Sequence, residues 1–180
     1  MNFSYVITVA IAIVDNATFI YNDVITIIMK SLIVYYSRTS TTKKLAEDIA
    51  GKVNGDIEEI HPKVNYQGKI GYARAGKDAM RENIIDIEPM NYNPQDYDVV
   101  YLGTPVWAGK ASTPLISYIK QNEGKFSNVK FFVLAASTGQ EATVEQLERY
   151  VSKKPLKTLT LTTKEIKKDL YEDKLAEFLK

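Results

Sequence analysis

The feature that most constrains the fold is an abrupt change of pattern between residues 32 and 53. Leu32–Tyr36 is a short run of apolar and aromatic residues, which predicts a buried strand. The amphipathic run over residues 43–53 repeats Leu45, Ile49 and Val53 at the spacing of one helix face. The six residues between these runs therefore join the end of a strand to the start of a helix.

This junction is rich in hydroxyl side chains, which predicts an anion site. Its residues are Ser37, Arg38, Thr39, Ser40, Thr41 and Thr42. Unpaired backbone N–H groups and the positive end of the helix dipole add donors at the same place. The alternative is that the hydroxyl of Ser40 or Thr41 only caps the helix. Because a cap needs one hydroxyl and not five, we favour a phosphate ligand.

Strand and helix patterns alternate along the rest of the chain. Further strands are predicted at residues 57–60, 98–103, 130–136 and 156–161, and a helix at residues 73–81. This alternation predicts one α/β domain over residues 29–180. Its sheet is expected to be open, parallel and five-stranded, doubly wound, with helices on both faces.

Three more helices are predicted from the residues at their starts. Thr113 is expected to cap a helix whose first residue is the following proline, because proline's missing N–H costs nothing at that position. Thr143 with Gln146 predicts a capping box for a helix that ends near residue 151. Thr162 with Glu165 predicts a second capping box. The helix that it opens is expected to carry Ile166, Leu170 and Phe178.

Three loops are expected to meet at the carboxyl edge of this sheet, where ligands of such folds bind. They are residues 37–42, 103–109 and 136–141, all rich in Gly, Ser and Thr. Trp107, the one tryptophan of the chain, is expected to lie past the end of its strand, exposed, and to stack on a ligand. Core packing is the alternative. Together the loops predict a ligand with a phosphate tail and a flat aromatic head.

Composition excludes several classes of chemistry. The chain has no cysteine, which excludes disulfide scaffolds, thiol nucleophiles and thiolate metal sites. Its one histidine, His61, leaves no cluster for a metal and is expected in a loop. A net charge of +1 gives no general attraction to nucleic acid or to an anionic membrane.

The first 28 residues differ from the rest of the chain. They hold no Lys or Arg, and their apolar run at residues 6–14 is too short to span a bilayer. Three interpretations remain: an extension outside the fold, an added strand or helix, or a weakly membrane-associating segment. Because Met29 comes directly before the first strand, we favour an extension over residues 1–28 that lies outside the core domain.

Two of these loops resemble the flavodoxin family. Tyr-Ser-Arg-Thr-Ser-Thr-Thr-Lys-Lys-Leu-Ala, residues 36–46, is similar to the phosphate loop of flavodoxins. Gly-Thr-Pro-Val-Trp-Ala-Gly, residues 103–109, looks like the second flavin loop of that family. The resemblance covers residues 29–180 without a long insertion in the last strand, as in short-chain flavodoxins. It implies the strand order 2-1-3-4-5.

The resemblance also implies a cofactor, flavin mononucleotide (FMN), held noncovalently. Residues 37–42 would hold its phosphate. The ring would lie against Trp107 and its neighbours, which are Thr104, Pro105, Val106, Ala108 and Gly109. The pyrimidine end of the ring would border Ser137, Thr138 and Gly139.

The sequence departs from the family pattern at three points. The family usually has glycine at position 40, so Ser40 is expected to occupy a left-handed or closely approached backbone position. The third loop lacks the aromatic residue that often covers the outer face of the flavin. The chain is also nearly neutral, whereas electron-carrier flavodoxins are typically acidic, so steering toward basic partners is expected to be weak.

The resemblance favours an electron-transfer protein, in which the flavin does the chemistry and no side chain acts as general acid or base. The alternative is an oxidoreductase that passes electrons from NAD(P)H to a quinone. A flavin-free binding module on the same fold is a third hypothesis. Partners are expected to be redox proteins or a small electron acceptor, with no nucleic acid and no membrane span. We expect a cytoplasmic monomer or weak dimer.

Overall fold

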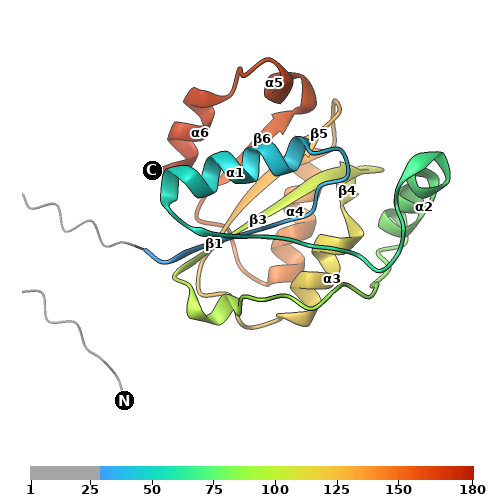
Figure 1. Ribbon diagram of the computed structural model, residues 1–180, viewed down its shortest axis with the longest axis horizontal. Helices are drawn as coiled ribbons and strands as arrows, with labels where there is room; N and C mark the ends of the chain where they lie inside the picture. The colour runs from blue at the N-terminus through green and yellow to red at the C-terminus, as the bar shows by residue number, and fades with distance from the viewer. Residues whose placement is uncertain (1–28) are drawn as a thin grey trace, which may run out of the picture.

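A twisted parallel sheet with helices on both faces forms the body of the protein (Figure 1). The structure is a computed structural model that describes residues 29–180, so the interpretation of residues 1–28 lies outside it. The strands are β1 (Ser31–Tyr35), β2 (Asp56–Glu59), β3 (Val99–Trp107), β4 (Lys110–Ala111), β5 (Val129–Ala135) and β6 (Thr158–Thr162). The helices are α1 (Thr41–Val53), α2 (Gly68–Met80), α3 (Thr113–Gln121), α4 (Gln140–Val151), α5 (Thr163–Lys167) and α6 (Glu172–Leu179), with a 3₁₀ turn at Pro94–Asp96.

The order of the parallel strands is β2-β1-β3-β5-β6, which confirms the predicted arrangement. β1 lies between β2 and β3, with Ile33 opposite both Ile57 and Tyr101. The short β4 was not predicted, and it pairs antiparallel with the end of β3. The strand order reverses between β1 and β3: the chain first adds β2 on one side of β1 and then β3, β5 and β6 on the other. The carboxyl ends of β1 and β3 therefore border the crevice in which ligands of this architecture bind.

Alternate residues of each strand pack into two separate cores. On one face, Ile33 and Phe132 are buried with residues of α1, α5 and α6. On the other face, Val34 and Phe131 are buried with residues of α2, α3 and α4. In Figure 1 the carboxyl ends of β1 and β3 point to the right, where α2 stands at the edge of the body. Within residues 29–180, the helices are all too short or too polar to cross a bilayer.

Of the two predicted capping boxes, one is confirmed and the other is wrong. The Thr162–Glu165 capping box is confirmed: Glu165 N donates to Thr162 Oγ1 at 3.2 Å, and Thr162 N donates to Glu165 Oε2 at 2.7 Å. The Thr143–Gln146 capping box is wrong. α4 begins after Gly139, so Thr143 lies inside the helix and donates to Gly139 O at 2.7 Å, while Gln146 Oε1 accepts from the amide of Ala111 at 2.8 Å.

The chain after β6 differs from the single helix that was predicted. It forms α5 and α6, separated by a break in which Asp169 has φ 53°. Ile166 and Phe178 are buried, but Leu170 lies in the break and is 65% exposed, so its predicted place on a helix is wrong. α3 begins one residue earlier than expected: Ser112 is its N-cap residue and Thr113 is its first helical residue, so the prediction that Thr113 caps this helix is wrong.

Candidate functional site

The loop between β1 and α1 leaves the first turn of α1 open to a ligand. Ser40 is the N-cap residue, with φ 60° and ψ 0°, and its hydroxyl makes no capping hydrogen bond. The expectation of a left-handed backbone at this position is therefore confirmed. Ser40 thus occupies the N-cap position, but its side chain does not cap the helix, and the alternative that its hydroxyl serves only as a cap is not supported. The N–H groups of the first turn stay available to an anion.

Ser37 supplies a second indication of a ligand at this loop. Its Oγ is buried and has no hydrogen-bond partner among residues 29–180. Buried polar atoms are almost always paired, so an unpaired one calls for a group that the protein itself does not provide. Thr39 and Thr41 place their hydroxyl oxygens 3.4 Å apart at the exposed side of the loop, and Thr42 is buried.

The second predicted loop is part of a β-hairpin. β3 continues through residues 103–107 and pairs with β4, with Trp107 opposite Lys110. Ala108 and Gly109 form the two-residue turn with φ 48° and 77°. Positive φ at both central residues is typical of type I′ hairpin turns. The expectation that the strand ends at Gly103 is wrong, because β5 pairs with β3 as far as Pro105, and β4 pairs with its last two residues.

Trp107 is buried, which corrects the prediction of an exposed indole. The residue is 7% exposed and belongs to the core beneath α2. Its ring meets Tyr36 edge-on at a centroid distance of 5.2 Å and Tyr66 at 5.0 Å. Burial raises the pKa of Tyr36 to about 12, and nearby Arg38 partly opposes the shift. The three rings form an aromatic cluster at the carboxyl ends of β1 and β3.

Tyr66 is a site residue that sequence reasoning missed, because it stands in a polar stretch without periodicity. It is 2% exposed, and its hydroxyl donates to Asp78 of α2 at 2.9 Å. Burial, followed by this carboxylate, raises the pKa of Tyr66. A Cβ on Gly71 would lie 2.3 Å from the backbone of Tyr66, so α2 rests on this tyrosine through a glycine. α2 and the aromatic cluster are thus joined closely.

The third loop meets the tip of the hairpin. Ser137 and Thr138 are exposed, and Gly139 has φ 98°. A Cβ on Gly139 would lie 3.1 Å from both Gly109 Cα and Val106 Cγ1. The predicted convergence of the second and third loops is therefore observed.

Thr104 and its neighbours divide into interior and surface positions. Thr104 is fully buried and its hydroxyl donates to Ser112 Oγ at 2.9 Å, so it faces the interior. Pro105 and Val106 are partly exposed, and Ala108 and Gly109 are exposed at the turn. Of this predicted group, the residues at the turn offer the most surface to a ligand.

Two hollows flank these loops. One, of about 350 Å³, lies beside Ser37 and Tyr36 and is otherwise lined by residues 59–67. The other, of about 300 Å³, lies between α2 and the hairpin, with Tyr72, Met80 and Val106 in its wall. Both sizes are at the lower end for small-molecule sites. No cluster of potential metal ligands occurs within the described part of the chain, residues 29–180.

The fold resembles several solved structures. A flavoprotein from Lactobacillus acidophilus NCFM, solved in complex with FMN, is 23% identical with a TM-score of 0.67, and the match covers 82% of this chain and 99% of that one. A protein from Bacteroides eggerthii DSM 20697 is 24% identical with a TM-score of 0.63, over 82% and 98% of the two chains. A flavodoxin from Fusobacterium nucleatum, bound to flavin mononucleotide, is 12% identical with a TM-score of 0.51, over 84% and 95%.

At these identities the similarity establishes the fold alone. A search of curated proteins gave no match. The sequence itself gives the stronger result, because the model of the family described as Flavodoxin matches residues 30–179. This match spans the strand-to-helix junction, the hairpin and the third loop, and the chain therefore belongs to the flavodoxin family.

Proposed function

We propose that the protein binds FMN noncovalently at the carboxyl edge of the sheet and serves as an electron-transfer protein. The observation that carries this proposal is the buried, unpaired Oγ of Ser37 beside the open first turn of α1. An oxygen-rich dianion accepts hydrogen bonds from such hydroxyl and backbone donors. The FMN complex of the Lactobacillus acidophilus relative supports the choice of cofactor.

The residues present fit the phosphate end of FMN. Residues 37–42 would hold the phosphate through Ser37 Oγ, the hydroxyls of Thr39 and Thr41, and the first amides of α1, with Arg38 adding positive charge. Thr104 is engaged with Ser112 and would hold no part of the cofactor.

The flat end of the cofactor would be bordered by the hairpin turn and the third loop. Ala108, Gly109, Ser137 and Thr138 expose backbone and small side chains there. Trp107 supports the hairpin from beneath, and we propose that it borders the ring from its buried position. Bound FMN supplies one-electron and two-electron transfer, while the chain binds it, orients it and limits its contact with water.

The first experiment is to purify the protein, record a visible spectrum, and titrate the flavin-free form with FMN and with riboflavin. We expect Ser37→Ala to weaken FMN binding about tenfold, because one hydrogen bond to a charged group is lost. Riboflavin, which lacks the phosphate, should bind both forms equally. Ser127→Ala, an exposed serine at the opposite edge of the sheet, is the control. A colourless protein that cannot be reconstituted would instead support the flavin-free module.

A second experiment uses the left-handed backbone of Ser40. We expect Ser40→Gly to stabilise the fold by at most about 1 kcal/mol, because glycine occupies positive φ without strain. It should also strengthen FMN binding by removing a Cβ beside the phosphate. Ser152→Gly is the matched control, since Ser152 has φ 58° at the end of α4. Equal gains in FMN affinity for both variants would argue against a phosphate at residue 40.

The exposed third loop supports a second candidate function, an NAD(P)H-dependent oxidoreductase. Ser137 and Thr138 leave the neighbouring surface open, without an aromatic cover. A small acceptor would have access to the cofactor there. Sustained turnover of NADH or NADPH with a quinone would favour this function, whereas its absence in a flavin-loaded protein would favour the electron carrier.

A further inference from the structure

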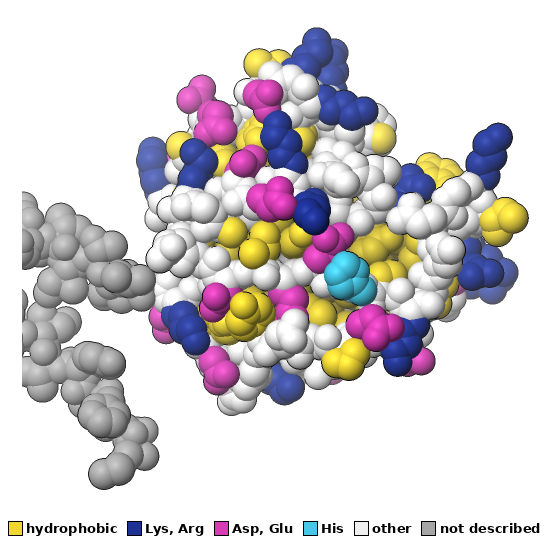
Figure 2. Space-filling view, in the orientation of Figure 1, with side chains coloured by type: hydrophobic (Ala, Val, Ile, Leu, Met, Phe, Trp, Pro, Cys, Tyr) yellow, Lys and Arg dark blue, Asp and Glu magenta, His cyan; other side chains and the backbone are white. Residues whose placement is uncertain are grey.

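α2 combines a buried edge with an outward surface that is both basic and apolar. Gly71, Ala75 and Ala79 face the core. The exposed cations are Lys69, Arg74, Lys77 and Arg81. The exposed apolar residues are Ile70, Tyr72 and Met80, at 82%, 63% and 67% exposure. Figure 2 shows basic and apolar side chains gathered on this lobe at the right of the view. We refer to these seven outward residues as the α2 surface.

The cations of the α2 surface have no carboxylate partners within residues 29–180, as the ion pairs of that region show. Nearby acidic residues are engaged elsewhere. Asp78 accepts from Tyr66 Oη at 2.9 Å and from Asn83 Nδ2 at 2.8 Å. Glu82 pairs with Lys110 and accepts from Tyr150 Oη at 2.8 Å. Glu82 is thus neutralised by Lys110, and Asp78 is the one nearby carboxylate on α2 that keeps its charge, so the four cations leave the α2 surface with a net positive charge.

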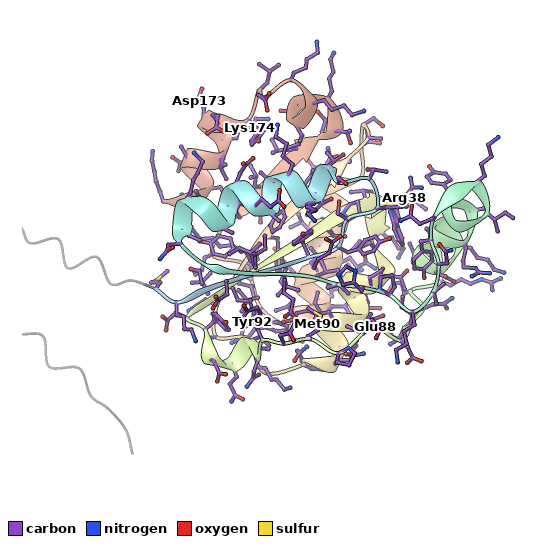
Figure 3. The ribbon with its side chains drawn as sticks, viewed as in Figure 1. Arg38, Glu88, Met90, Tyr92, Asp173 and Lys174 are labelled. Atoms are coloured by element: carbon purple, nitrogen blue, oxygen red, sulfur yellow. The ribbon has the colours of Figure 1, made fainter. Side chains whose placement is uncertain are left out.

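Two of the three apolar residues of the α2 surface border the hollow of about 300 Å³ beside the hairpin. Tyr72 and Met80 form its α2 side, while Val106 and Ala108 form the hairpin side. Arg38 extends from the phosphate loop toward α2 (Figure 3). Its guanidinium carbon lies 4.8 Å from the ring centre of Tyr72. An apolar depression with arginine and lysine around it thus lies directly beside the proposed cofactor site.

We propose that the α2 surface is the docking site for an acidic electron-transfer protein. Tyrosine, methionine and arginine are the residue types enriched at protein interfaces, and an apolar centre with a polar rim is their usual plan. Unpaired cations on one lobe of a nearly neutral protein steer a negatively charged partner to that lobe. The inference rests on the proposed electron-transfer function, because docking here brings a partner next to the hairpin turn.

The test is a titration of the full chain with a small acidic plant-type ferredoxin at low ionic strength, followed by calorimetry. We expect Arg74→Glu/Lys77→Glu to weaken binding about tenfold or more, and added salt to weaken the wild-type complex. The matched control is Lys125→Glu/Lys154→Glu. It makes the same change of net charge at exposed residues near the amino ends of β5 and β6.

Met80→Ser tests the apolar centre separately. We expect it to weaken ferredoxin binding while leaving the salt dependence unchanged, because no charge is altered. Both flavin-loaded and flavin-free protein are titrated. Ferredoxin binding that persists without flavin would support the docking site even if the protein proved not to use FMN. The docking proposal and the proposed function are therefore tested separately.

Three outcomes would overturn the docking proposal. The first is tighter binding of basic cytochrome c than of ferredoxin. The second is an equal loss of ferredoxin binding in both double variants, which would indicate a net-charge effect. The third is tighter binding to anionic phospholipid vesicles or to a short DNA duplex, either of which would assign the α2 surface to that other class of partner.

Discussion

α2 and the α5–α6 segment are both rich in charge, yet they use it differently. Two cations at α6 have carboxylate partners: Lys52 pairs with Glu172 at 3.0 Å, and Lys174 pairs with Glu165 at 2.7 Å. The exposed lysines at α5, which are Lys164, Lys167 and Lys168, have no such partner among residues 29–180. Asp173 and Lys174 stand on this segment in Figure 3. The cations of the α2 surface have no carboxylate partner among residues 29–180. Ion pairing therefore distinguishes α6 from α2, while α2 differs from α5 in bordering the hollow beside the hairpin.

The two regions also differ in what attaches them to the body. α2 rests on Tyr66 and Trp107 through small residues. The carboxyl end of α6 is held by a buried cation: Lys130 Nζ donates to the carbonyl oxygens of Phe178 at 3.0 Å and of Leu179 at 3.4 Å. Lysines at a helix carboxyl terminus satisfy its last carbonyls and suit its dipole. Apolar contacts and the hydrogen bond from Tyr66 to Asp78 attach α2, whereas a buried cation adds to the apolar contacts of α6.

The largest effect is expected for Trp107→Ala. It removes a buried aromatic side chain from beneath α2, and such truncations cost about 3–5 kcal/mol. Urea unfolding followed by circular dichroism measures the loss. Tyr72→Ala, on the exposed side of α2, is the control and should cost far less. Near-wild-type stability of Trp107→Ala would mean that the indole is not a core residue and would restore the expectation of an exposed ring.

Lys130→Ala is expected to come next. It leaves the last carbonyls of α6 without their buried cationic donor and should cost about 2–3 kcal/mol. Burial lowers the pKa of Lys130, and nearby Lys157 adds to the shift. Lys154→Ala, at an exposed position, is the control for the same unfolding measurement. Equal stability of the two variants would show that α6 does not depend on its buried cation.

Glu165→Gln tests the paired charges of α5 and α6 through pH. Hydrogen bonds from Lys174 and Thr162 lower the pKa of Glu165 from 4.5 to about 2. The contribution of this carboxylate is therefore complete above pH 4.5 and is lost as the pH falls toward 2. We expect Glu165→Gln to cost about 1 kcal/mol at pH 7, as for other capping residues.

The same variant should lose less stability than the wild type between pH 4.5 and pH 2. Urea midpoints measured across that range check this expectation. Glu145→Gln, on the exposed side of α4, serves as the control and should follow the wild-type pH dependence. A Glu165→Gln curve that runs parallel to the wild type would contradict the assignment.

The smallest effect on stability is expected for Arg74→Glu/Lys77→Glu. Both side chains are exposed and unpaired in the described structure, so the free energy of unfolding should change by no more than about 0.5 kcal/mol. If the same variant also lost ferredoxin binding, the cations of α2 would be shown to serve binding and not stability. A large loss of stability would show instead that these cations hold α2 in place.

The sheet was predictable because its strands are buried apolar runs between clear helix patterns. Leu32–Tyr36 and residues 98–103 marked strands whose order the family resemblance then supplied. Capping patterns were less reliable. Thr162–Glu165 was correct, but Thr143–Gln146 has the same spacing inside a helix whose start is decided by the left-handed backbone of Gly139.

The candidate site was predictable where local sequence determines the backbone, and it was not predictable where tertiary packing determines which side chains are buried. The unusual backbone of Ser40 followed from the glycine that the family has there. The burial of Trp107 did not follow, because it depends on Tyr36, on a β4 of two residues, and on Tyr66 arriving from an aperiodic stretch. When segments distant in the sequence bury a side chain, the residues next to it in the sequence carry no pattern that predicts its burial.

Glu82 connects the end of α2 to the hairpin and to α4. It follows α2 with φ 51°, and its carboxylate receives Lys110 from the hairpin and the Tyr150 hydroxyl from α4. Because one side chain joins all three elements, a displacement of the end of α2 strains two charge-assisted contacts at once. A force applied to that helix is consequently transmitted to the strand that follows the hairpin turn, so that the two elements shift together and not independently.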